Sequence, residues 1–324
     1  MKIGLDVMGG DFAPKANLSG AILARQVLGK DDDIVLIGNK ELICDELEAM
    51  NSNPEDFIIV HAGEVIEMGE SPTRALVQKP DSSIAVGFKL MKTGEINAFA
   101  SAGSSGAMLV GSIYSVNTIQ GIIRPTTTAI VPKVEGGFNL ILDVGTNPDA
   151  KPDVLYQFAI LGSLYAEFVH NIQNPKIGLL NIGEEENKGN LLSQSVYNLM
   201  KGSKKINFVG NIEGRHLFRD KADVIVCDGF TGNIVLKQAE ALYRIMIKRG
   251  VRDEYLDRFN YENYGGTPIL GVNGTVIVGH GISNDKAIKN MILLAKEVHE
   301  AGLTQKIKEA LVQHSLTNKL ADEI

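Results

Sequence analysis

The chain has 324 residues and a mass of 35.0 kDa, enough for one large domain or two ordinary ones. Hydrophobic residues make up 44% of it and charged residues 22%, a globular composition that excludes disorder and fibrous repeats. The net charge of -7 and the pI near 5.5 argue against broad attraction to nucleic acid or anionic lipid, so we expect no nucleic-acid partner.

The number of cysteines and the N-terminal sequence indicate the cellular compartment. Cys44 and Cys227 are too few for a disulfide framework and lack the spacing of metal ligands. Met1 leads straight into a strand-like segment, without a signal peptide's apolar stretch, and nothing approaches the roughly 18 uninterrupted apolar residues of a membrane span. We therefore expect a cytoplasmic protein, with any membrane role peripheral at the inner face.

Short apolar runs alternate with segments of helical period along the chain. The predicted strands are residues 3–6, 34–37, 57–60, 98–100, 140–142, 177–180, 208–209 and 224–226. This alternation predicts an α/β fold with a doubly wound, mainly parallel sheet. We expect a single α/β body over residues 1–324, with two lobes, a soft boundary near 148–152, and a polar excursion at 249–264.

Two loops in the first part of the chain suit an anion. Ligands of such sheets bind beyond the carboxyl ends of strands, where small residues leave backbone N–H groups accessible. The candidate substrate-binding residues here are Gly9, Gly10 and Asp11 after the first strand, and Ser101, Gly103, Ser104, Ser105 and Gly106 before a helix that is predicted to run to about Val116. The alternative for the second loop is a tight turn with a serine N-cap.

Familiar catalytic motifs are missing from the sequence. It contains no GxxxxGK[ST] loop, and the segment 279–284 ends in Asn where a dinucleotide fingerprint needs Gly or Ala. Gly103-Ser104-Ser105-Gly106 is one residue short of a serine hydrolase's nucleophile elbow. P-loop hydrolysis, nucleotide binding and serine hydrolysis are therefore disfavoured.

Polar loops later in the chain hold further candidates. Lys188 precedes a predicted helix start, where the helix dipole disfavours a cation, so a merely structural role would gain little. Asn233 is either a cap of a helix beginning near Ile234 or a catalytic group, and the residues alone leave both open. His280 lies in a glycine-flanked loop where it can contact a ligand, whereas Cys227 is expected to be a small buried hydrophobe.

Taken together, in their order along the chain, these loops resemble those of the bacterial phosphate acyltransferase family. That family makes acyl-phosphate from acyl-acyl carrier protein and inorganic phosphate for phospholipid synthesis. The matching stretches, spread over about residues 2–292, are Met8–Asp11, Ser101–Gly103 with Gly106–Ala107, Arg124–Pro125, Leu142–Gly145 with Asn147, Lys188–Asn190, Gly210–Asn211, Asp228–Asn233 and Tyr264–Gly266. Ser104-Ser105 stands where Asn-Thr is more typical, and Thr146 where Ala is common.

The resemblance implies a fold, a site and partners. The fold would be related to isopropylmalate dehydrogenase and phosphotransacetylase, in a homodimer with no metal or nucleotide cofactor. The family's functional Lys and Asn correspond to Lys188 and Asn233, and Asn147 and Asp228 would help to bind substrate. The partners would be acyl carrier protein, inorganic phosphate and a membrane glycerol-3-phosphate acyltransferase that receives the product.

Membrane contact is expected to be weak. Segment 249–264 is shorter than the amphipathic helical hairpin through which some members touch the membrane. Before it, Val235, Ala239, Leu242 and Met246 form an apolar stripe of helical period. Such a stripe can line a dimer interface or an acyl tunnel, or lie on a bilayer surface. We expect it to be at least partly buried in a homodimer, with only weak, salt-sensitive binding to vesicles.

The expected chemistry explains the missing motifs. Inorganic phosphate is itself an oxyanion nucleophile, so its attack on a thioester needs no serine, base or metal. The site must supply N–H groups and a cation for phosphate, and donors for the oxygen that gains charge. The two alternatives are a nicotinamide-dependent dehydrogenase of related fold and a non-catalytic scaffold that binds acyl chains or carrier protein.

Overall fold

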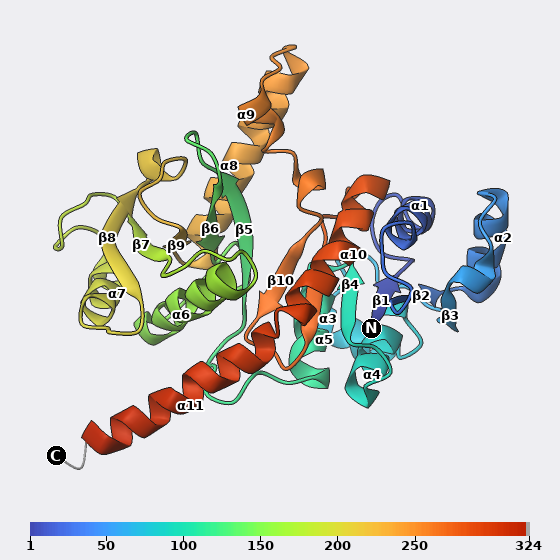
Figure 1. Cartoon of the computed structure of the whole chain (residues 1–324), viewed down its shortest axis with the longest axis horizontal. Helices are drawn as coiled ribbons and strands as arrows, with labels where there is room; N and C mark the ends of the chain where they lie inside the picture. Colours follow the sequence, from blue (N-terminus) through green and yellow to red (C-terminus); the bar gives the residue numbers. More distant parts are fainter. Residues whose placement is uncertain (322–324) are drawn as a thin grey trace. The chain divides into compact units, whose positions relative to one another are not determined.

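The computed structural model describes residues 1–321, with side chains through Val312, and divides into two compact units (Figure 1). Unit 1 comprises Met1–Thr118 and Tyr261–Glu300, and unit 2 comprises Ile119–Asn260 and the segment from Ala301 onward. Residues 148–152, the predicted soft boundary, lie within unit 2 at the start of a helix. The single body with two lobes stays a prediction.

Unit 1 is built on a mainly parallel sheet with the strand order β3-β2-β1-β4-β11-β10. All neighbouring strands are parallel except β10 and β11, which form an antiparallel pair. The strands are β1 (Lys2–Asp6), β2 (Asp33–Gly38), β3 (Ile58–His61), β4 (Ala98–Ser101), β10 (Thr267–Leu270) and β11 (Thr275–Val278).

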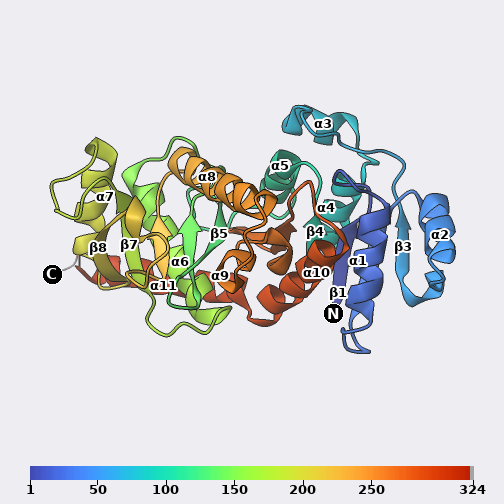
Figure 2. The same ribbon diagram turned by 90° about the horizontal axis from the view of Figure 1, so that it is seen from above.

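Helices pack in pairs on the sheet of unit 1. Helix α1 packs against α10, where Gly20 lets the backbone approach Ile288, and α4 packs against α5, where Gly111 admits the ring of Phe88 (Figure 2). These close approaches bury the apolar faces of both helix pairs. The helices are α1 (Lys15–Arg25), α2 (Lys40–Ala49), α3 (Pro72–Gln78), α4 (Ser83–Thr93), α5 (Ser105–Ser115) and α10 (Asp285–Glu300).

Unit 2 has its own sheet, with the strand order β5-β6-β9-β7-β8. Strands β5 and β6 form an antiparallel hairpin, and the remaining neighbours are parallel. The strands are β5 (Thr126–Pro132), β6 (Phe138–Leu142), β7 (Lys176–Asn181), β8 (Asn207–Glu213) and β9 (Val224–Val226).

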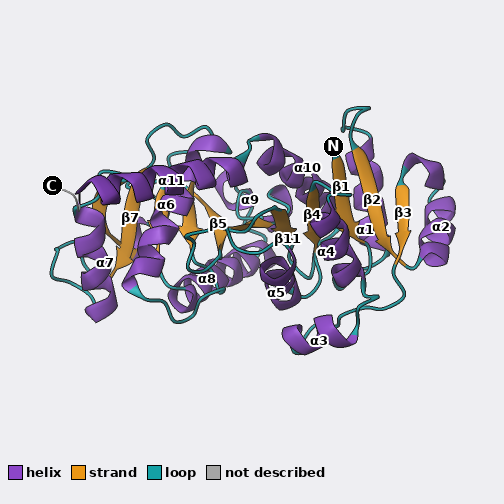
Figure 3. Ribbon diagram, turned by 90° about the horizontal axis from the view of Figure 1, so that it is seen from below, coloured by secondary structure: helices purple, strands orange, loops and turns teal. Residues whose placement is uncertain are grey.

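The two faces of the unit 2 sheet carry different helices. Helices α6 and α11 lie on one side of the strands and α8 on the other (Figure 3). Leu142 and Val224 meet Gly162 of α6, whereas Ile141 and Ile225 belong to the apolar cluster against which Val235 of α8 packs. The helices are α6 (Pro152–Phe168), α7 (Leu191–Lys201), α8 (Gly229–Lys248), α9 (Glu254–Asp257) and α11 (Leu303–Ala321).

The doubly wound, mainly parallel α/β fold is confirmed by these sheets. All eight predicted strands are present, and β5, β10 and β11 were not predicted. The excursion at 249–264 contains α9, where Tyr255 and Arg258 donate hydrogen bonds to the carbonyl groups of Pro132 and Lys133. No helix within residues 1–321 has the length and apolar character needed to cross a bilayer.

Candidate active site

The two glycine-rich loops of unit 1 pack directly on each other. A Cβ added to Gly9 would lie 2.7 Å from the backbone nitrogen of Gly103, so only glycine permits this approach. Gly10 has a φ of +102°, in the region that favours glycine. The carboxyl ends of β1 and β4, which are neighbours in the sheet, thus bring these loops together.

A buried carboxylate holds the two loops in place. Ser101 Oγ donates to Asp6 Oδ2 at 2.6 Å and accepts from the Gly103 N–H at 2.9 Å. The N–H of Met8 donates to the other oxygen of Asp6. Burial raises the pKa of Asp6, against the lowering effect of these hydrogen bonds. Ser101 therefore orients the loops, and its contact with substrate stays a prediction.

The serines that follow lie at the start of α5. Ser104 is the N-cap, and its Oγ accepts from the Ala107 N–H at 3.3 Å, which confirms the capping alternative for this residue. Ser105 is exposed in the first turn. A Cβ on Gly106 would meet Pro72 of α3 at 2.7 Å, so this glycine keeps α3 close to the loop.

The loop after β11 joins the same cluster. The Asp11 N–H donates to the carbonyl oxygen of Gly281 at 2.7 Å. Ser283 Oγ donates to the carbonyl oxygen of His280, and the imidazole of His280 lies 5.3 Å from the ring of Tyr261. The candidate residues of unit 1 therefore lie in three adjoining loops, or at the ends of β4 and α5 that flank one of them, at one edge of its sheet.

In unit 2, Asn147 is buried, and the amide N–H groups of its side chain are engaged by protein. Its Nδ2 donates to the Pro125 carbonyl at 2.8 Å and to Asp143 Oδ2 at 2.7 Å. Asp143 also accepts from the N–H groups of Gly145, Thr146 and Asn147, while burial raises its pKa. Asn147 thus shapes the loop after β6, and direct contact with substrate stays a prediction.

The structure corrects the predicted helix start beside Asn233. Helix α8 begins at Gly229, and its N-cap is Asp228, whose carboxylate accepts from the N–H and Oγ of Thr231, both at 2.8 Å. The predicted cap role of Asn233 is therefore wrong, because the glycine-rich segment 229–232 is helical and not a loop. Asn233 lies one turn inside α8 and donates to the Val144 carbonyl at 3.1 Å.

Lys188 lies on the exposed loop between β7 and α7, two residues before the N-cap Asn190. Its main chain is fixed, since its carbonyl accepts from Asn181 Nδ2 and its N–H donates to Glu185. Its ammonium group has no hydrogen bond or ion pair among the residues whose side chains are described. The neighbouring Lys201, in contrast, is paired with Glu186.

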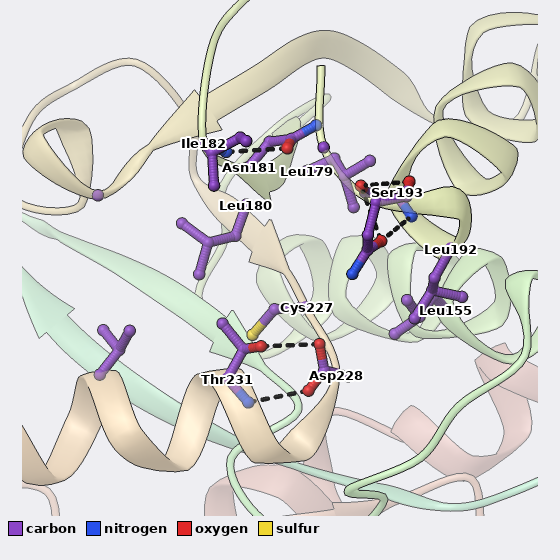
Figure 4. A pocket seen from close by; sticks show the side chains of 14 residues that line it. Leu155, Leu179, Leu180, Asn181, Ile182, Leu192, Ser193, Cys227, Asp228 and Thr231 are labelled. Atoms are coloured by element: carbon purple, nitrogen blue, oxygen red, sulfur yellow. Dashed lines mark hydrogen bonds between the residues drawn. The ribbon is translucent and has the colours of Figure 1, made fainter. Parts of the chain in front are cut away.

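A pocket of about 390 Å³ opens beside this loop, within unit 2 (Figure 4). Its apolar lining comes from several elements: Leu155 of α6, Leu179 and Leu180 of β7, Leu192 of α7 and Val235 of α8. The four leucines were not predicted from the sequence to be functional, because each one alone is an ordinary core leucine, whereas Val235 was expected as part of the apolar stripe of α8. Their shared position, at or after the carboxyl ends of strands, was the available signal.

Metal and thiol chemistry find little support among the described residues. No group of three His, Cys, Asp or Glu side chains within residues 1–312 is placed to hold a metal ion. Cys227 is buried at the end of β9, and this burial raises the pKa of its thiol well above the ordinary value. Cys227 therefore serves packing, as the sequence predicts.

Comparison with known proteins identifies the family. A family model described as "Fatty acid synthesis protein" matches residues 1–255 and 245–306. The chain is 45% identical over 332 residues to a phosphate acyltransferase of Desulfitobacterium hafniense (strain DSM 10664 / DCB-2), covering 96% of this chain and 98% of that one. It is 40% identical to the phosphate acyltransferase of Dictyoglomus turgidum (strain DSM 6724 / Z-1310), covering 99% of each chain.

Solved structures share the fold at low sequence identity. A phosphotransacetylase from Streptococcus pyogenes matches with a TM-score of 0.63 and 16% identity, covering 92% of this chain and 94% of that one. The EutD phosphotransacetylase from Staphylococcus aureus matches with a TM-score of 0.60 and 14% identity, over the same shares of the two chains. Because its sequence matches span nearly its whole length, this chain belongs to the phosphate acyltransferase family and is an acyl-transferring enzyme.

Proposed function

We propose that this enzyme transfers the acyl group of acyl-acyl carrier protein to inorganic phosphate, at an early step of phospholipid biosynthesis. A phosphate oxygen attacks the thioester carbonyl carbon, the C–S bond breaks, and the products are acyl-phosphate and the carrier thiolate, which takes up a proton. The observation that carries this proposal is the unpaired ammonium group of Lys188, on the loop whose next residue, Gly189, lines an apolar pocket, in a chain of this family.

The roles of the site residues follow from what the reaction needs. In unit 1, the loops at Gly9–Asp11 and Ser101–Gly106 offer small residues where an anion can approach backbone N–H groups. In unit 2, Lys188 offers a point charge and Asn233 an amide donor. One of these two groups stabilises phosphate and the other the oxygen that gains charge in the tetrahedral intermediate.

Membership of the family favours acyl transfer over the two alternatives. A nicotinamide-dependent dehydrogenase would need a nucleotide fingerprint, and segment 279–284 lacks the final Gly or Ala. A non-catalytic scaffold would bind acyl chains or carrier protein without consuming phosphate. Turnover that depends on phosphate and leaves nicotinamide absorbance unchanged would separate the three functions.

The proposed setting of the enzyme follows the family. We propose a cytoplasmic homodimer that needs no cofactor, touches the membrane only peripherally, and hands acyl-phosphate to a membrane glycerol-3-phosphate acyltransferase. The exposed apolar side chains of Leu242, Ile245 and Met246, in the second half of α8, support the homodimer, because a second copy of the chain can cover them.

The test of the donor compares two thioesters of the same acyl chain. The enzyme is mixed with phosphate and hexadecanoyl-acyl carrier protein, or with hexadecanoyl-coenzyme A, and acyl-phosphate is measured by mass spectrometry. We expect the higher kcat/KM with the carrier protein. A preference for coenzyme A would contradict the proposed donor and leave the family assignment in place.

A further inference from the structure

The pocket of unit 2 lies where ligands of this fold class bind. Strands β7 and β9 are parallel neighbours, and the chain leaves their carboxyl ends in different directions. Helix α7 follows β7 and packs with α6, whereas α8 follows β9 and packs on the opposite face of the sheet. Such a divergence leaves a crevice between two strand ends, and the pocket occupies it.

Most of the polar side-chain atoms around the pocket are already engaged by the protein. Asp228 accepts from both the N–H and the hydroxyl of Thr231. Asn181 donates to Lys188 and Asn211 through Nδ2, and its Oδ1 accepts from the Ile182 N–H. Asn190 Oδ1 accepts from the N–H and Oγ of Ser193 (Figure 4). These groups close helix ends and loops, so little polar capacity is left to recognise a sugar or a nucleotide base.

What the pocket offers to a ligand is an apolar wall. Leu155, Leu179, Leu180 and Leu192 converge from α6, β7 and α7, and Val235 adds a branched side chain from α8. The thiol of Cys227, also in the lining, has a raised pKa and is therefore uncharged at neutral pH. An unbranched hydrocarbon chain is the ligand that gains most from such a wall, because it loses water without losing hydrogen bonds.

The loop that lines one side of the pocket also carries a charge that can orient such a ligand. Gly189 belongs to the pocket lining, and Lys188, the residue before it, carries an ammonium group that no described side chain neutralises. A chain whose polar head lies beside Lys188 and whose tail lies among the leucines satisfies both features at once. We propose that this pocket of unit 2 binds the hydrocarbon chain of the acyl thioester, with the carbonyl end at the Lys188 rim.

This inference rests on the proposed function, and it adds that the chain-length preference is set by unit 2. The test places a large side chain in the pocket through Leu192→Trp. Its matched control is Leu199→Trp, on the same helix, where the leucine is 45% exposed and outside the pocket lining. For each variant, kcat/KM is measured with butyryl and with hexadecanoyl thioesters.

We expect Leu192→Trp to lower the hexadecanoyl-to-butyryl ratio of kcat/KM by about 10-fold or more, because even single methylenes in an apolar pocket change this parameter that much. Retained turnover of the butyryl thioester shows that the variant is folded. If circular dichroism shows that it is not, Leu192→Phe replaces it. The Leu199→Trp ratio should equal that of the wild type.

A second measurement separates the pocket from the reaction. Binding of cis-parinaric acid, a fluorescent long-chain fatty acid, needs no turnover and should weaken about 10-fold in Leu192→Trp alone. If Leu192→Trp changes neither the chain-length ratio of kcat/KM nor the binding of cis-parinaric acid, the pocket does not bind the hydrocarbon chain. The proposed function would not be affected by that result. A wild-type enzyme that converts no thioester, yet binds the probe at Leu192, would contradict the proposed function but not the assignment of the pocket to a hydrocarbon chain.

Discussion

At the scale of single residues, Lys188 is the group on which the proposed chemistry depends most. Its exposed ammonium group makes no described contact, so Lys188→Ala should leave the melting temperature unchanged. It should lower kcat/KM for acyl-phosphate formation by about 100-fold or more, the usual cost of removing one electrostatic stabiliser of a transition state. Lys201→Ala, which removes a lysine paired with Glu186, is the control and should keep normal turnover. Near-normal activity of Lys188→Ala would contradict its role.

Asn233 and Asp228 can be told apart by what their removal changes. Because Asp228 caps α8, Asp228→Ala should lower stability by about 0.5–2 kcal/mol. Asn233 makes one hydrogen bond, to the Val144 carbonyl, so Asn233→Ala should cost only about 1 kcal/mol of stability but most of the activity. Chemical denaturation and steady-state kinetics on both variants test this. If Asn233→Ala loses stability in proportion to activity, its role is structural.

His170 should make the protein sensitive to acid. Its ring lies between Phe138 and Tyr165, at centroid distances of 4.9 and 4.7 Å, and burial lowers its pKa from 6.5 to about 4. The unfolded chain therefore binds a proton near pH 6.5, whereas the folded chain resists protonation until about pH 4. The contribution of His170 to the free energy of unfolding should fall by about 3 kcal/mol as the pH drops through this window, and this contribution should level off below it.

The variant His170→Phe isolates this effect. Phenylalanine keeps an aromatic ring between Phe138 and Tyr165 and cannot take up a proton. Denaturant midpoints measured from pH 7 to pH 4 should therefore fall less steeply for the variant than for the wild type. If the denaturant midpoints of the two proteins fall in parallel with pH, protonation of His170 is not the cause of the acid sensitivity.

At the scale of elements, α8 combines a packed and an exposed half. Val235 packs in the core of unit 2, but Leu242, Ile245 and Met246 are 53%, 53% and 39% exposed. We expect a second copy of the chain to cover these residues. Sedimentation should give a dimer at micromolar concentration, and the double variant Leu242→Glu/Ile245→Glu should give a monomer with an unchanged far-UV spectrum.

The end of α8 also determines how strongly we expect the protein to bind membranes. Binding of the wild type to anionic vesicles should be weak and lost at high salt, because Lys248, Arg249 and Arg252 supply only a small basic cluster in a chain of net charge -7. A wild-type monomer, or tight vesicle binding that survives high salt, would instead indicate a hydrophobic membrane anchor.

The sequence predicts some elements better than others, for physical reasons. Parallel strands such as β2 and β9 are buried on both faces, so they read as continuous apolar runs. Strands β5, β10 and β11 were missed: β5 is rich in threonine and β10 contains Pro268, and each of the three has an antiparallel neighbour in its sheet. The sequence-based prediction started α8 too late, because glycines suggest a loop. In the structure, Asp228 is the N-cap and Gly229–Gly232 is helical.

The candidate site was also predictable from the sequence only in part. The loops that carry Gly9, Ser101 and Lys188 were predictable, since small or charged residues directly after a strand are a local signal. The engagement of Asn147 by Pro125 and Asp143 was not, because it depends on a hydrogen-bond network formed only in the folded chain. The leucine pocket was also hidden, because its wall is assembled from α6, β7, α7 and α8.

At the scale of the whole molecule, the proposed reaction depends on phosphate itself being the nucleophile. The direct test incubates the enzyme with hexadecanoyl-acyl carrier protein and oxygen-18-labelled phosphate, and analyses the product by mass spectrometry. If a phosphate oxygen attacks the thioester carbon, acyl-phosphate should form and retain every labelled oxygen, and its formation should stop when phosphate is omitted. Free fatty acid formed at the same rate with or without phosphate, and no acyl-phosphate, would contradict the account.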